Sequence, residues 1–213
     1  MNYAIEFTRI TQPFLTITSR KRSLKHLYIF VETGSLLVRL GKHELAVTEG
    51  QAVWLPFNTL YALTTFPNTS LVQIEFSCRL KHDFVSQGGR VEANQMVRTT
   101  IERLISINDE EYRTLLQQVL LQEVLLVKPA LLTSALCEAL RGWSAESQPN
   151  NIITKEIDTA LRLREAIRLS RSGKPQTEIV DTLFDGDSEQ LSAIAKVLLS
   201  PKDNQELARY FDI

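Results

Sequence analysis

The first 80 residues alternate short apolar runs with turn-forming residues. Val, Ile, Leu, Phe and Tyr gather in these runs, and Gly, Pro and Asn separate them. This spacing is typical of short antiparallel strands in a sandwich or small barrel, and the strand lengths favour a jelly roll. The predicted strands are residues 3–8, 14–19, 26–32, 35–40, 44–47, 52–55, 61–65 and 71–77.

The pattern changes near residue 80, after which Gly and Pro become sparse. Apolar residues then recur every three to four positions, as they do in amphipathic helices. The predicted helices are residues 92–106, 109–127, 130–143, 154–172, 175–184, 188–199 and 204–211. We therefore expect an α+β fold: an antiparallel barrel, then a helical hairpin, then an all-α segment.

The segment SAESQPNN, residues 144–151, is the best candidate for a linker. Its Ser, Pro and Asn residues compete with regular backbone hydrogen bonding. We place the main boundary there. The predicted domains are a barrel with its hairpin, 1–148, and a helical region, 149–213.

Charge and hydropathy exclude some function classes. The 213 residues include 24 basic and 25 acidic side chains, so the whole chain has no electrostatic bias toward nucleic acid or a membrane surface. No segment approaches the roughly 18 consecutive apolar residues of a membrane span, and the N-terminus does not resemble a signal peptide. We expect a soluble, cytoplasmic protein without a membrane partner.

One motif is specific. Five residues separate Gly50 from Pro56, Tyr61 stands five positions after Pro56, and Gly34 ends an apolar strand. This frame resembles the two motifs of the cupin superfamily, whose metal ligands are histidines and a glutamate. Tyr61 stands where the family has a histidine, and Leu27 stands where it has the glutamate. A divalent ion in a barrel needs such ligands, so we expect no metal and no cofactor.

The barrel stretch LYIFVETGSLLVRLGKHELAVTEGQAVWLPFNTLYAL, 27–63, resembles the cupin-type sensor and dimerisation domain of AraC-family transcriptional regulators. The C-terminal LSAIAKVLLSPKDNQELARYFDI, 191–213, resembles the opening of their helix-turn-helix region. In that resemblance Ala208 lets the next helix pack closely, and Ile213 fills the joint. The recognition helix should follow Ile213, so we expect a truncated regulator that binds DNA weakly or not at all.

Ligand-binding candidates come from the barrel. By the family pattern Tyr61 points inward, where its hydroxyl meets either a small polar ligand or a backbone partner. Weaker candidates lie on neighbouring strands or in the basic segment SRKRSLKH, 19–26, which either binds an acidic effector or is a solvated loop. These candidates are Tyr28, His26, Trp54, Lys21 and Arg39. Strand alternation also allows Arg39 simply to face water.

The helix predicted at 109–127 carries more apolar surface than one barrel flank needs. Its stripe either dimerises with a second copy, as the resemblance implies, or packs within the chain. The stripe residues are Leu116, Val119, Leu120, Val124 and Val127. A second helix aligns Arg164, Arg168 and Arg171, either as a phosphate-contacting face or as an ordinary solvated one.

The leading hypothesis is a homodimeric AraC-like regulator, not an enzyme, whose barrel senses a small effector and whose complete C-terminal domain would bind DNA. No DNA-contacting residue is assigned. One alternative is a metal-free cupin isomerase or epimerase, with His26 and Tyr61 as base and acid lining one cavity. The other is a protein-interaction module that lacks DNA binding and pairs through residues 109–127.

Overall fold

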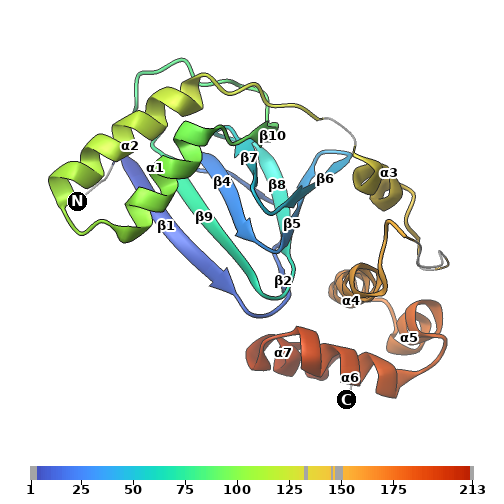
Figure 1. The fold of residues 1–213 in the computed structure, drawn as a ribbon. Helices are drawn as coiled ribbons and strands as arrows, with labels where there is room; N and C mark the ends of the chain where they lie inside the picture. The colour runs from blue at the N-terminus through green and yellow to red at the C-terminus, as the bar shows by residue number, and fades with distance from the viewer. Residues whose placement is uncertain (1–3, 132–133, 145, 147–150, 212–213) are drawn as a thin grey trace.

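The computed structural model describes residues 4–131, 134–144, 146 and 151–211, and its strands form two antiparallel sheets (Figure 1). The first sheet has the order β1-β9-β4-β7-β10, and the second has the order β2-β8-β5-β6, with β3 beside β8. The strands are β1 (Ile5–Gln12), β2 (Thr16–Ile17), β3 (Lys21–Arg22), β4 (His26–Thr33), β5 (Ser35–Leu40), β6 (His43–Thr48), β7 (Gln51–Leu55), β8 (Leu60–Thr65), β9 (Thr69–Phe76) and β10 (Gly89–Glu92).

Most of the strand prediction is confirmed, and β5 has its predicted bounds. Two short strands were missed. β3 has only two residues and pairs Lys21 with Tyr61. β10 begins at the second of two consecutive glycines and pairs with β7, with Gly89 opposite Trp54. Short polar or glycine-rich segments become strands because a neighbouring strand offers hydrogen bonds, which no local pattern reveals.

Seven helices are described: α1 (Gln95–Ser106), α2 (Glu110–Leu125), α3 (Ala135–Arg141), α4 (Lys155–Arg171), α5 (Gln176–Phe184), α6 (Ser188–Leu198) and α7 (Pro201–Phe211). The helix predicted at 130–143 begins later than expected. Ala130 instead exchanges two backbone hydrogen bonds with Arg90, each 2.9 Å long. Helix α3 begins only after Ser134, whose side chain caps the amide of Cys137.

Side-chain alternation divides the interior into three apolar layers. On β4, Leu27, Ile29 and Val31 point between the two sheets. Tyr28 and Phe30 point from the other face of β4 toward α1 and α2. Because both faces of this strand are covered, five consecutive residues of β4 are buried.

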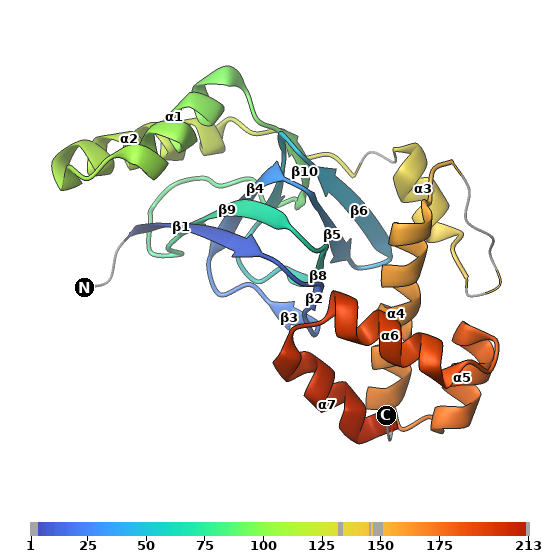
Figure 2. The ribbon, with the colours of Figure 1, turned by 60° about the horizontal axis from the view of Figure 1, so that its bottom comes forward.

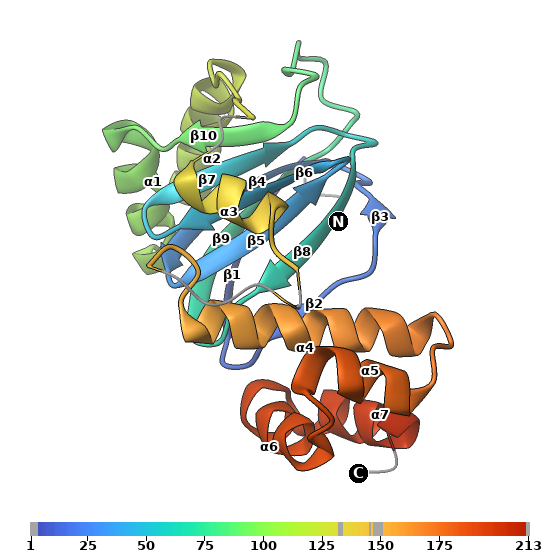
Figure 3. The same cartoon turned by 90° about the vertical axis from the view of Figure 1, so that its right-hand side faces the viewer.

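The helical hairpin α1–α2 covers the outer face of the first sheet, and α3 with α4–α7 lies beside the second sheet (Figures 1 and 3). Figure 3 shows α4 running between the barrel and the group α5–α7, and in Figure 2 helix α6 crosses in front of α4. Leu37 and Ala46 of the second sheet share one apolar core with α4–α7. The amide of Leu15 also donates to the carbonyl of Leu198, at 2.7 Å. The helical segment therefore packs directly on the barrel.

The expected fold class is confirmed: α+β, with a cupin-like jelly-roll barrel, a helical hairpin and a C-terminal helical segment. The predicted domain boundary between 148 and 149 lies outside the described residues, as does Ile213.

The turn between β4 and β5 depends on Gly34. Its φ is +82°, and an added Cβ would lie 2.5 Å from Thr69 Oγ1 and 2.9 Å from Thr69 Cα. Gly41 also has a positive φ, +59°, but nothing lies within 4 Å of an added Cβ.

We expect Gly41→Ala to lower the free energy of unfolding by about 1 kcal/mol, the cost of the left-handed backbone. Gly34→Ala also brings the new Cβ into overlap with the β9 backbone. It should therefore lower the free energy of unfolding by about 1–3 kcal/mol more than Gly41→Ala does. Urea denaturation of both variants measures the difference. Equal losses would contradict this packing argument.

Candidate ligand-binding cavity

A cavity of about 370 Å³ opens between the two sheets at one end of the barrel. We call it the barrel cavity. The inward residues of β4, β8 and β9 give it apolar walls, namely Leu27, Ile29, Tyr61, Leu63 and Leu71. Gln73 and Glu75 continue the inner face of β9 toward the mouth. The cavity thus combines an apolar interior with polar groups at its opening, as small-molecule sites do.

The basic segment 19–26 lies across this mouth. Lys21, Arg22 and Lys25 all line the barrel cavity. The segment is held in place, because Ser23 is buried and its hydroxyl donates to the carbonyl of Pro56 at 2.6 Å. The backbone of the segment is therefore fixed at the mouth, while the side chains of Lys21 and Arg22 are exposed to solvent.

Lys25 is the centre of an ion-pair network. Its Nζ lies 2.8 Å from Glu6 Oε2 and 2.7 Å from Glu75 Oε2. Hydrogen bonds to Glu6 and then Glu75 raise the pKa of Lys25. Burial works to raise the pKa of Glu75, but hydrogen bonds from Lys25 and Gln73 outweigh it and hold that pKa below its ordinary value. Lys25 is thus already neutralised by two carboxylates.

Lys21 has a different environment. Its Nζ lies 5.8 Å from the centre of the Tyr61 ring, within the range of a cation–π contact. Tyr61 is 5% exposed, and burial raises the pKa of its hydroxyl. Of the six residues proposed for ligand binding, Lys21 and Tyr61 lie together at the barrel cavity.

His26, Tyr28 and Trp54 do not line this cavity, because they point to the opposite face of the first sheet. The His26 ring stacks on Trp54 at 5.6 Å and on Phe84 at 4.3 Å. Its Nδ1 accepts a hydrogen bond from the amide of Phe57, and burial lowers its pKa. His26 therefore acts as a neutral acceptor in an aromatic stack.

Trp54 and Tyr28 are core residues, both 0% exposed. The Trp54 indole donates to the carbonyl of Val85 at 2.8 Å. The Tyr28 hydroxyl has no hydrogen-bond partner among the described residues, and burial raises its pKa strongly. Arg39 lies on the outer face of the second sheet, as alternation predicts; its side chain is exposed and lies beside α4.

The cupin frame persists in the backbone. Asn58, between Pro56 and Tyr61 of the motif, has φ +64°, a conformation that asparagine tolerates better than most residues. Within the described ranges no three His, Cys, Asp or Glu side chains gather as metal ligands. Leu27 and Tyr61, at the positions of the family's ligands, contribute to the inner apolar layer instead.

The stripe proposed for dimerisation is largely used within the chain. Leu120 and Val124 are fully buried against α1 and the first sheet, and Leu116 and Val127 pack partly against the same core. Leu120 and Val124 therefore pack within the chain, while Leu116 and Val127 keep part of their surface exposed. Val119 stays 38% exposed. Tyr112 and Leu115 extend its apolar face toward the start of α2, with exposures of 39% and 58%.

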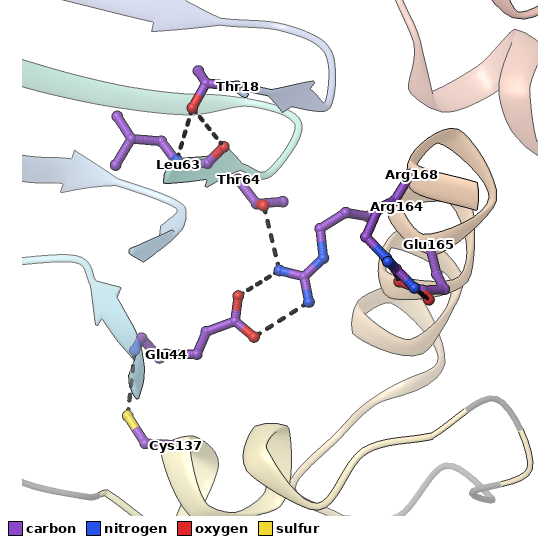
Figure 4. A network of polar contacts seen from close by, with 9 residues as sticks. Thr18, Glu44, Leu63, Thr64, Cys137, Arg164, Glu165 and Arg168 are labelled. Atoms are coloured by element: carbon purple, nitrogen blue, oxygen red, sulfur yellow. Dashed lines mark hydrogen bonds and ion pairs between the residues drawn. The ribbon is translucent and has the colours of Figure 1, made fainter. Parts of the chain in front are cut away.

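The arginines of α4 face the barrel. Arg164 makes a bidentate ion pair with Glu44 of β6, with N–O distances of 2.5 and 3.2 Å (Figure 4). Arg168 pairs with Glu165 one turn away on the same helix. Neither sequence-based alternative, a phosphate-contacting face or a plainly solvated one, anticipated this contact. Glu44 carries no local signal, because its partner lies 120 positions away.

No protein-family model matches the chain, and no curated protein does. Apo ToxT from Vibrio cholerae is similar in structure, with a TM-score of 0.44 and 12% identity, covering 95% of this chain and 97% of that chain. ToxT bound to an unsaturated fatty acid also has a TM-score of 0.44 and 12% identity, with coverages of 93% and 92%.

A cupin superfamily protein from Desulfitobacterium hafniense has a TM-score of 0.34 and 8% identity, covering 36% of this chain and 71% of that chain. The structures similar to this chain thus include cupin proteins and ToxT, a regulator of the AraC family. None of the described helices combines the length and the apolar character needed to span a bilayer.

The Lys25–Glu75 pair predicts an acid-dependent stability. The pKa of Glu75 is depressed in the folded state, so its stabilisation is present above the unfolded-state pKa and is lost as pH falls through the folded-state pKa. Glu75→Gln should lower the free energy of unfolding by up to about 1 kcal/mol at neutral pH, since both side chains are partly exposed.

The difference between wild type and Glu75→Gln should shrink as pH falls below the ordinary value of 4.5. Thermal unfolding followed between neutral and acid pH measures it. Glu49→Gln, at an exposed position, controls for loss of one negative charge. A difference that persists at the lowest pH would show that the ion pair is not its cause.

Proposed function

We propose that this chain is the sensor part of an AraC-like transcriptional regulator and that its barrel cavity binds a small organic anion with an apolar body. The observation that carries the proposal is an apolar cavity between two sheets whose mouth is crossed by a basic segment. An apolar wall favours a hydrocarbon body, and a cationic mouth favours an anionic head group.

The anionic head has a defined place. Lys25 is already paired with Glu6 and Glu75, so it adds little net charge. Lys21 is exposed and lies above Tyr61, and Arg22 stands beside it. We assign the head group to Lys21, because its ammonium group and the Tyr61 hydroxyl are hydrogen-bond donors at the edge of the apolar wall.

Signal transfer would use the contact between barrel and helices. The segment that begins with Leu15 hydrogen-bonds to the end of α6 and continues through β2 to the basic mouth. A ligand that prefers one arrangement of this segment shifts the population of arrangements of α4–α7.

DNA binding is assigned to a complete C-terminal domain. Helices α6 and α7 are joined by a short turn, and Ser200 caps α7 through the amide of Asp203. Leu207 and Phe211 of α7 are buried in the helical core. These two helices correspond to the positioning half of a helix-turn-helix unit. Base recognition would require a further helix that enters the major groove. A regulator of this kind would act in the cytoplasm.

We propose a non-enzymatic role. The isomerase or epimerase alternative requires His26 and Tyr61 to reach one substrate. His26 points to the outer face of the first sheet, whereas Tyr61, on β8 of the second sheet, points between the sheets. Their positions give that reaction no support.

Decanoate is a suitable probe, because it is a carboxylate with an apolar body, as are unsaturated fatty acids of the kind bound in a ToxT structure. We expect decanoate to raise the melting temperature of the protein by mass action. Lys21→Gln should weaken decanoate binding about tenfold, the cost of one charge-assisted contact.

Two controls isolate the head-group contact. Decanol, which has no charge, should bind wild type and Lys21→Gln equally. Lys128→Gln removes a charge from an exposed site outside the cavity and should bind decanoate as wild type does. Equal decanoate affinity in wild type and Lys21→Gln would refute the assigned head-group site.

We further propose that a homodimer forms through the remaining apolar face of α2, composed of Tyr112, Leu115 and Val119. These residues are spaced three and four positions apart, so they share one side of the helix. Leu115→Glu should convert a dimer into a monomer in light scattering, since it places a charge in the interface.

Val197→Glu introduces the same charge at an exposed apolar position on α6 and should leave the dimer intact. A Leu115→Glu protein that remains dimeric would exclude this face. A wild-type chain that is monomeric at all concentrations would favour the interaction-module alternative, in which α2 pairs with a different protein.

A further inference from the structure

A cleft lies between the outer face of the second sheet and helix α4. We call it the junction cleft. It comprises two adjoining cavities of about 320 and 410 Å³. The two cavities are continuous, because four residues line both of them: Arg39, Glu44, Arg164 and Glu165. Cavities of this size hold small molecules.

The junction cleft and the barrel cavity lie on opposite faces of the second sheet, and of their lining residues they share Thr18. On β8, Ala62 and Thr64 line the junction cleft, whereas Tyr61, Leu63 and Thr65 line the barrel cavity. The second sheet stands between them, because successive side chains of a strand point to opposite faces. A ligand in one does not contact a ligand in the other through these residues.

The charge of the junction cleft is unlike that of the whole chain. Seven basic side chains line it against two carboxylates, although the chain has a net charge of −1. Four of these cations, Arg20, Arg39, Lys42 and Arg141, come from outside α4, and the others come from α4 itself. Because like charges repel one another, seven basic side chains around one cleft favour the binding of an anionic ligand.

The two carboxylates hold the arginines of α4 in position. Glu44 accepts from both terminal nitrogens of Arg164, whose Nη1 also lies 3.4 Å from Thr64 Oγ1 (Figure 4). Glu165 pairs with Arg168, and this hydrogen bond holds the pKa of Glu165 below its ordinary value. Each carboxylate occupies only part of a five-donor guanidinium, so donors remain for a ligand.

We propose that the junction cleft binds a small molecule carrying two or more negative charges, of the phosphate-ester or diphosphate class. Arg20 and Arg39 on the barrel and Arg168 on α4 bind its anionic groups from opposite walls. Phosphate is favoured over a single carboxylate because several planar guanidinium groups converge, and each can donate two parallel hydrogen bonds.

The bound anion links the barrel to α4. It strengthens the connection already made by Arg164 and Glu44, and so favours the arrangement in which the helical segment packs on the second sheet. This role does not depend on the effector proposed for the barrel cavity.

The test is calorimetric binding of pyrophosphate to the full chain at constant ionic strength. The junction variant Arg39→Gln/Arg168→Gln changes two exposed side chains and leaves Arg164–Glu44 intact. Its pyrophosphate affinity should fall at least about tenfold. The matched control Arg79→Gln/Arg103→Gln removes two charges from exposed positions outside the cleft and should keep wild-type affinity.

Several results would overturn the proposal: no pyrophosphate binding by wild type, an unchanged affinity in the junction variant, or an equal loss in the control. A duplex DNA that binds wild type while pyrophosphate does not would assign the cations to nucleic acid instead. Lys21→Gln should bind pyrophosphate normally. Loss of decanoate binding with retained pyrophosphate binding therefore separates this site from the barrel cavity.

Discussion

Every strand of the barrel has two faces, and covering both of them is the constraint on which the rest of the structure depends. Buried apolar side chains fill the space between the sheets, and helices must cover the outer faces. The hairpin α1–α2 covers the first sheet, and α3–α7 meet the second. Polar side chains on these outer faces are therefore enclosed between layers, where partners become available.

The same constraint explains why the apolar stripe of α2 did not by itself distinguish packing within the chain from dimerisation. A helix that packs on a sheet and a helix that packs on a second helix need apolar stripes of similar width. The stripe therefore indicates that this side of the helix is buried, but it does not identify the surface that covers it. In α2 the inner residues, such as Leu120 and Val124, pack on α1 and the sheet. Only the outer row around Leu115 is left for a second molecule.

The two polar regions of the molecule differ in chemistry. The barrel cavity has apolar walls and a mouth at which Lys25 is already neutralised by carboxylates. The junction cleft has an excess of cations, whose guanidinium groups are ordered by Glu44 and Glu165. One region thus favours an amphipathic acid and the other a compact polyanion. Both lie beside the contact between barrel and helices, where binding can influence how the layers pack.

Much of this was predictable from local pattern. Alternation along residues 35–40 determined the strand and its inward face, and the glycine frame around Gly34 and Gly50 indicated a cupin-like barrel. The inward position of Tyr61 was what the resemblance of that frame to the cupin motifs implied. These features depend on backbone geometry and on near neighbours in the chain, so the sequence alone determines them.

Only the tertiary structure decided which polar groups meet. The pairing of Arg164 with Glu44, and the placement of His26 in an aromatic stack away from Tyr61, join residues far apart in the chain. The position of Ala130 beside β10 has the same origin. Such contacts depend on how the layers pack. The partner of a side chain is a residue of the surface that packs against it, and the neighbouring residues in the sequence do not indicate which surface that is.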